Sequence, residues 1–156
     1  MTAHQFLVET DWLAANLDNP SVRVLDSTIA MTRQPNGGWE ATSGRDGFDA
    51  GHIPGAQFVD LMTELKDAES PFGYMLPTAD GFAAKMTELG ISNDTQVVVY
   101  VSAVPWWATR LWWMFRVFGH ENVAVLNGGL GKWNAEGRAL STETTNYARA
   151  EFTASY

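Results

Sequence analysis

Residues 96–101, Gln-Val-Val-Val-Tyr-Val, decide the fold of this chain. The stretch is almost wholly apolar and β-branched, which is typical of a central strand that is covered on both faces. A short loop over residues 102–105 leads to an aromatic helix over residues 106–118. Because this helix is apolar nearly all round, we expect it to be buried. A covered strand followed by a buried helix indicates a parallel α/β sheet.

Strands and helices alternate along the rest of the chain. Further strands are expected over residues 22–25, 56–59 and 122–126, and further helices over residues 11–17, 79–89 and 130–136. The helix over 79–89 has the clearest ends, because Thr78 can cap its start and Gly90 occupies the position after its last turn. Residues 29–47 and 68–77 are expected to be loops, the first built on the turn Pro35-Asn36-Gly37-Gly38. The pattern predicts an α/β fold with a parallel sheet of about five strands and helices on both faces.

Length and charge exclude several classes of function. The chain has 156 residues, which is enough for one domain, and its formal net charge is −8. Such a charge repels nucleic acid and anionic membrane surfaces. The first nine residues have neither a basic segment nor a long apolar stretch, so no signal peptide is expected. The apolar run over 106–118 is far shorter than the ~20 residues of a membrane span. We expect a cytoplasmic protein with no nucleic-acid and no membrane partner.

The sequence contains no cysteine. Disulfides, thiolate catalysis and cysteine-based zinc or iron–sulfur sites are therefore excluded for this chain. Its three histidines, His4, His52 and His120, are scattered, so we expect no metal site and no cofactor. Residues 127–129, Asn-Gly-Gly, are predicted to form a tight turn, since the spacing of a phosphate-binding loop is missing.

Three segments together resemble the rhodanese family, the thiosulfate and 3-mercaptopyruvate sulfurtransferases. They are Phe-Asp-Ala-Gly-His-Ile-Pro-Gly-Ala at 48–56, Val-Val-Val-Tyr at 97–100 with Arg-Leu-Trp-Trp at 110–113, and Phe-Gly-His at 118–120 with Val-Leu-Asn-Gly-Gly-Leu at 125–130 and Trp133. The chain looks most like the N-terminal, non-catalytic half of tandem members, whose second domain carries the nucleophilic cysteine. This implies a rhodanese-like domain over residues 1–140. The polar, Thr-rich residues 141–156 lack periodicity and are interpreted as a linker or C-terminal tail rather than core.

The resemblance places the family's catalytic loop directly after the strand at 96–101. Sulfur transfer there needs a thiolate that accepts a sulfur atom, and backbone N–H groups that stabilise the resulting anion. Val101 can hold no persulfide, Pro105 removes one N–H donor, and the sequence places no base beside the Ser102 hydroxyl. We therefore predict no catalytic residue, an inactive isolated chain, and a vestigial active-site loop made of Val101, Ser102, Ala103, Val104, Pro105, Trp106, Trp107 and Arg110.

Three polar side chains allow a functional and a structural interpretation. Arg45 either faces a second domain or a substrate, or forms an ordinary surface ion pair. His52 either reaches a composite active site or fixes the turn that follows it. Arg110 either ties the loop to the helix or is a relic of anion binding. For all three side chains the structural role is favoured.

The tryptophans suggest where a partner would bind. Trp112 and Trp113 are expected in the core, whereas Trp106 and Trp107 either join them or anchor an interface at the C-terminal end of the sheet. The first functional hypothesis is a structural N-terminal half of a sulfurtransferase, with a Cys-bearing second domain docked at Trp106 and Trp107. The alternative is a stand-alone, non-catalytic binding or regulatory module that uses the same tryptophans.

Overall fold

A five-stranded parallel sheet forms the centre of the molecule, whose computed structural model describes residues 5–156. Its strand order is β1-β7-β6-β2-β5. The strands are β1 (Leu7–Val8), β2 (Val22–Asp26), β5 (Gln57–Phe58), β6 (Gln96–Tyr100) and β7 (Val123–Leu126). The apolar strand β6 lies in the middle, in register with β2 from the pair Val22–Gln96 to the pair Asp26–Tyr100. The predicted α/β fold with a parallel sheet of about five strands is confirmed.

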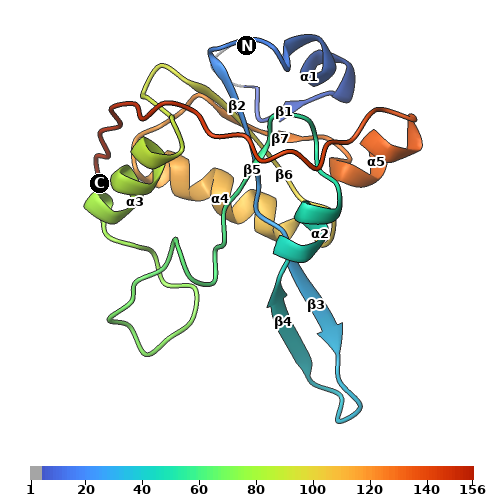
Figure 1. Cartoon of the computed structure of the whole chain (residues 1–156). Coiled ribbons are helices and arrows are strands. Elements are labelled where there is room, and N and C mark those ends of the chain that lie inside the picture. The colour runs from blue at the N-terminus through green and yellow to red at the C-terminus, as the bar shows by residue number, and fades with distance from the viewer. Residues whose placement is uncertain (1–4) are drawn as a thin grey trace.

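Helices cover both faces of this sheet (Figure 1). They are α1 (Thr10–Asn16), α2 (Arg45–Ala50), α3 (Ala79–Glu88), α4 (Trp106–Val117) and α5 (Gly129–Ala135). Successive residues of β6 point to opposite faces, as the strand pleat requires. Val97 and Val99 pack on the side of α3 and α4, whereas Val98 and Tyr100 pack on the side of α1, α2 and α5. No helix within residues 5–156 is both long and apolar enough to cross a membrane.

Helix α4 is less completely buried than its composition indicates. Its Leu111, Met114 and Phe115 are in the core. Trp113, which was expected in the core, is 42% exposed, so this prediction is wrong. Trp112 is half-buried and its Nε1 donates to the Val123 carbonyl at 3.2 Å. A helix on the outside of a sheet keeps one face towards solvent, and the apolar residues that fall on that face stay exposed.

The segment 29–47, expected to be one long loop, contains a β-hairpin and a helix. Strands β3 (Ile29–Arg33) and β4 (Trp39–Ser43) pair antiparallel, and α2 follows. The predicted turn is present, and the N–H of Gln34 donates to the Gly38 carbonyl at 2.7 Å. The hairpin projects from the body of the domain (Figure 1). Its strands were missed because only Ile29 among their apolar residues is fully buried, so they show no clear alternation of buried and exposed residues.

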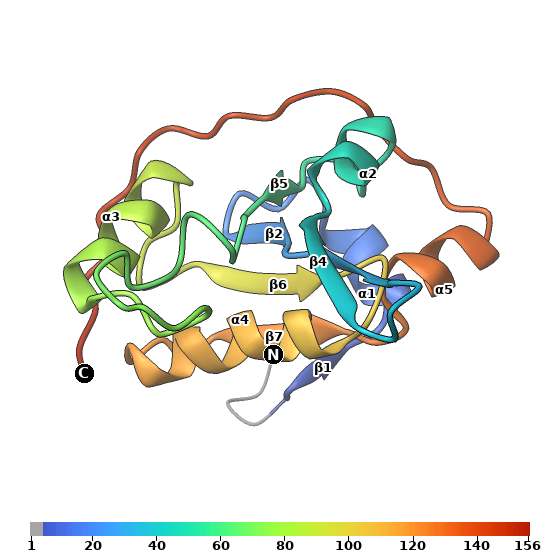
Figure 2. The same cartoon turned by 90° about the horizontal axis from the view of Figure 1, so that it is seen from below.

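Residues 141–156 have no helix and hardly any strand, but they are not detached from the domain. The segment crosses the molecule from α5 past α2 to α3 (Figure 2). His52 and Ser141 exchange two backbone hydrogen bonds of 2.9 and 2.8 Å. The Tyr147 hydroxyl donates to the Gly55 carbonyl at 2.9 Å, and Phe152 is buried in the core. The expectation that this segment does not contribute to the core is therefore wrong for Phe152.

Candidate functional site

The loop between β6 and α4 lies at the C-terminal end of the sheet, where α/β proteins place their ligand sites. Two neighbouring strands end there and the chain then leaves them in different directions, into the β3–β4 hairpin after β2 and into α4 after β6. The ends of these strands, Asp26 and Tyr100, are opposite each other in the register. Residues 101–107 thus occupy the switch point of the sheet.

Hydrogen bonds from the residues after β2 hold this loop in place. The backbone N–H of Ser102 donates to the Thr28 hydroxyl at 3.0 Å. The Ser27 hydroxyl donates to the Trp107 carbonyl at 3.1 Å. Thr28 in turn donates its hydroxyl and its N–H to one oxygen of the Asp26 carboxylate, at 2.5 and 2.8 Å. The loop is therefore anchored through Thr28 to a buried carboxylate.

Asp26 is the site residue that the sequence did not reveal. Burial raises the pKa of its carboxyl group, and the two hydrogen bonds from Thr28 oppose that shift only in part. The Ser102 hydroxyl lies 3.4 Å from the Thr28 hydroxyl, which stands between it and the carboxylate. Within residues 5–156 the Ser102 hydroxyl therefore has no direct hydrogen bond to a base, and the arrangement supports anchoring of the loop rather than activation of a nucleophile.

Val101 occupies the position where the resemblance places the family's cysteine. Its side chain is only 5% exposed and packs into the core on the side of α3 and α4. Its carbonyl accepts a hydrogen bond of 3.1 Å from the N–H of Leu130. An aliphatic side chain at this place can neither attack nor carry sulfur, so the loop lacks the reactive group that the chemistry requires.

Replacing Gly129 with alanine is expected to lower the free energy of unfolding by about 2 kcal/mol or more. Gly129 has φ +57°, and an added Cβ would lie 2.6 Å from the Val101 carbonyl oxygen. Gly131, in the same helix, has open space around its missing Cβ, so Gly131→Ala is the matched control and should be neutral or stabilising. Urea denaturation measures both. Equal stabilities of the two variants would contradict the close approach of the turn to the loop.

A cavity of about 460 Å³ opens beside the loop. Most of its lining is apolar or glycine, with Val101, Ala103 and Pro105 on one side and the turn Asn127–Gly129 on the other. That turn is present as predicted, with Gly128 in the left-handed conformation at φ +82°. The cavity has room for a small ligand or for an apolar side chain of a partner, but its lining contains no charged group.

The two tryptophans of the loop differ in their surroundings. Trp106 is 68% exposed at the start of α4. Trp107 is half-buried, and its ring lies 5.1 Å from that of Tyr74, in the loop before α3. Arg110 donates to the Tyr74 carbonyl and lies over the Trp113 ring, and burial lowers the pKa of its guanidinium. Arg110 therefore ties the loop before α3, and not the loop after β6, to helix α4.

Arg45 and His52 lie away from this loop. Arg45 is exposed and pairs with Asp49 one helical turn later, with 3.0 Å between Nε and Oδ1. His52 is buried and stacks on the ring of Phe48. Its two ring nitrogens lie 2.8 and 2.9 Å from the carbonyl oxygens of Phe48 and Glu143. Neither side chain lines the cavity at the loop.

His120 does not belong to a metal-ligating cluster within residues 5–156. His120 is buried against Phe115 and Phe152, burial lowers the pKa of its imidazole, and its Nε2 lies 3.2 Å from the Asn122 carbonyl. His4 lies outside the described residues. Residues 5–156 contain no group of three or more potential metal-ligating side chains.

The central parallel sheet, the helices on both faces and the loop from strand to helix at the switch point define this chain as an α/β domain of the rhodanese type. Comparisons with known proteins place the chain in the same class. The family described as "Rhodanese-like domain" matches residues 9–136. Thiosulfate sulfurtransferase of Cricetulus griseus is 41% identical over 97% of the chain and 50% of its own length. The 3-mercaptopyruvate sulfurtransferase of Escherichia coli K12 is 36% identical over 97% of the chain and 52% of its own length.

A solved structure is also similar over nearly the whole chain. The crystal structure of SseA from Escherichia coli, a 3-mercaptopyruvate sulfotransferase, has a TM-score of 0.85 and 35% identity, over 97% of this chain and 56% of that one. The chain belongs to the rhodanese-like domain family. It spans about half the length of the curated relatives that it matches, and it contains no cysteine.

Proposed function

We propose that this chain is the structural N-terminal half of a thiosulfate or 3-mercaptopyruvate sulfurtransferase. In this role it supports sulfur transfer by a second, Cys-bearing rhodanese domain and does not itself react with sulfur. Two observations support the proposal: the sulfurtransferase relatives are about twice as long as the chain, and no thiol is present. The loop that would carry the reaction holds a buried valine in place of a nucleophile.

The exposed Trp106 is the observation on which the docking role depends. A tryptophan that is 68% exposed, next to an apolar cavity of about 460 Å³, has the character of an interface anchor. Both features lie at the C-terminal end of the sheet. A second domain placed there would cover Trp106 and close a cleft over the loop, so that the substrate would be held between the two domains.

A chimera tests this role. The chain replaces the corresponding half of the E. coli 3-mercaptopyruvate sulfurtransferase, and turnover of 3-mercaptopyruvate is measured. We expect sulfur transfer in the chimera and a loss of at least about tenfold with Trp106→Ser, because an aromatic interface anchor commonly contributes 2 kcal/mol or more. Trp39→Ser is the matched control: Trp39 is 62% exposed but lies on the projecting hairpin, and its loss should leave turnover unchanged.

A folded chimera that transfers no sulfur, or equal losses with both variants, would contradict the docking role. The stand-alone binding module is the alternative, and it is favoured by the further exposed aromatic side chains Trp39 and Phe72, which are 62% and 72% exposed. In that case the chain has its partner outside sulfur transfer, and Trp106→Ser weakens binding of that partner without any effect on turnover.

A further inference from the structure

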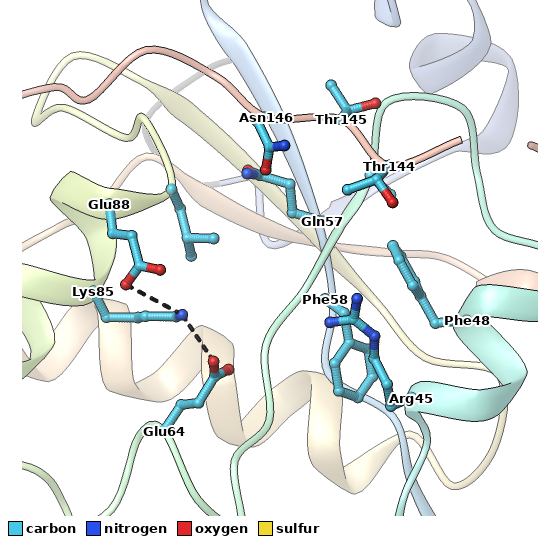
Figure 3. A pocket seen from close by; sticks show the side chains of 12 residues that line it. Arg45, Phe48, Gln57, Phe58, Glu64, Lys85, Glu88, Thr144, Thr145 and Asn146 are labelled. Atoms are coloured by element: carbon cyan, nitrogen blue, oxygen red, sulfur yellow. Dashed lines mark hydrogen bonds and ion pairs between the residues drawn. The ribbon is translucent and has the colours of Figure 1, made fainter. Parts of the chain in front are cut away.

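The C-terminal segment is fastened to the domain where it passes helix α2. Thr144 of the segment and Phe48 of α2 line the same cavity of about 200 Å³ (Figure 3). Just before this point, His52 and Ser141 exchange their two backbone hydrogen bonds. The imidazole of His52 also takes part: its Nε2 lies 2.9 Å from the Glu143 carbonyl oxygen, and its Nδ1 lies 2.8 Å from that of Phe48. One buried side chain thus joins α2 to the segment through both ring nitrogens.

Both of these contacts require the ring nitrogen to be the donor, because a carbonyl oxygen can only accept. A neutral imidazole has a proton on one nitrogen and a lone pair on the other. In either neutral tautomer of His52, one lone pair would therefore face a carbonyl oxygen at 2.8 or 2.9 Å. An imidazolium carries N–H groups on both nitrogens and satisfies both carbonyls.

The groups in direct contact with the ring favour a positive charge. The Phe48 carbonyl lies in the last turn of α2, where the partial charge of the helix is negative. The Phe48 ring stacks on the imidazole, with 4.0 Å between the centroids and 6° between the planes. The face of an aromatic ring attracts a cation. Glu143 is an exposed residue, so solvent screens its own carboxylate.

Asp26, on β2, supplies a negative charge on the inner side of the ring. Burial raises the pKa of its carboxyl group, and a positive charge on His52 is one of the interactions that oppose this shift. Tyr100, on β6, adds no charge, because burial raises the pKa of its hydroxyl far above its ordinary value. Arg45, on α2, brings a positive charge near the Phe48 ring, but it is exposed and paired with Asp49. The buried charge that faces His52 is therefore a carboxylate.

We propose that His52 is a buried imidazolium whose two N–H groups latch the C-terminal segment onto α2, and that loss of one proton opens this latch. The charged ring binds both carbonyls, so the latch is intact at low pH and is lost as the pH rises and His52 releases a proton. Opening frees the Glu143 carbonyl and weakens the backbone pair between His52 and Ser141, while Phe152 farther along stays in the core. The inference is independent of the proposed docking role.

NMR spectra of the whole chain, labelled with ¹⁵N, test the protonation state of the ring. At about pH 7.5 an ordinary imidazole is roughly nine-tenths neutral, yet we expect His52 to show two ring N–H groups. His120 is the internal comparison: burial lowers the pKa of its imidazole more than its backbone hydrogen bonds raise it, so its ring should show one N–H. A single ring N–H on His52 at this pH would overturn the proposal.

Amide hydrogen exchange tests the latch itself. The N–H of Ser141 donates to the His52 carbonyl at 2.8 Å and reports on the attachment of the segment. After correction for the intrinsic exchange rate, its protection should fall at least about tenfold between about pH 6 and about pH 9, because a hydrogen bond from a charged group is lost. The N–H of Val98, in the central strand, is the reference for the stability of the whole fold, and its protection should change less.

Two variants separate the latch from an ordinary anchor. His52→Gln keeps one donor but cannot gain or lose a proton in this range, so the protection of Ser141 should be low and independent of pH. Tyr147→Phe is the matched control, since it removes another anchor of the segment, the hydrogen bond to the Gly55 carbonyl, and leaves His52 in place. It should lower the protection of Ser141 but keep its dependence on pH. Circular dichroism checks the fold of each variant. Protection of Ser141 that does not change with pH in the parent chain, or that changes equally in folded His52→Gln, would contradict the latch.

Discussion

Replacing Phe82 with alanine is expected to lower the free energy of unfolding by about 4 kcal/mol. Phe82 is fully buried on α3, and its ring contacts three other aromatic rings. The centroid distances are 5.1 Å to Phe115, 4.7 Å to Phe118 and 5.8 Å to Phe152. The substitution leaves a cavity where α3, α4 and the C-terminal segment meet, so all three lose contacts at once.

Urea denaturation measures this effect as a lower midpoint with an unchanged slope. The melting temperature should fall by roughly 10 °C for a domain of this size. Phe72→Ala is the matched control, because Phe72 is 72% exposed and its loss should change the free energy of unfolding by less than about 0.5 kcal/mol. A loss below about 1 kcal/mol for Phe82→Ala would show that the aromatic cluster is not the centre of this side of the core.

A cysteine introduced at position 102 is expected to react with a thiol reagent at least about 100 times faster than one at position 101. Ser102 is exposed at the loop, whereas the side chain of Val101 is 5% exposed and in the core. A buried thiol has a raised pKa and reacts only when the structure opens, while an exposed thiol forms the reactive thiolate without unfolding.

The rates are compared for Ser102→Cys and Val101→Cys at one pH, under native conditions and in urea. The parent chain, which has no cysteine, serves as the blank. In urea the two rates should become equal, because the difference comes from burial alone. Equal rates under native conditions would contradict the core position of residue 101.

The sequence was sufficient for the main elements because their signals are local and strong. Strand β6 is apolar on both faces, and the capping residue Thr78 does accept a hydrogen bond from the N–H of Gly81 at 3.1 Å. The tight turn at 127–129 follows from its glycines, of which Gly128 and Gly129 have positive φ. The family resemblance rested on the same elements together with the segment at 48–56.

Elements that depend on distant contacts were not predictable. Strand β1 has two residues and is defined by its pairing with β7. Phe152 is buried only because the extended C-terminal segment returns to α3. The hydrogen bonds between Thr28 and Ser102 link residues 74 positions apart, which periodicity cannot show.

A sulfurtransferase assay tests whether the purified chain can accept or transfer a sulfur atom. The donor is thiosulfate or 3-mercaptopyruvate, and the acceptor is a thiol. We predict no turnover above a protein-free blank, and an intact mass that is unchanged after incubation with either donor. Turnover in proportion to the chain's concentration, or a mass increase by one sulfur atom, would contradict a purely structural role.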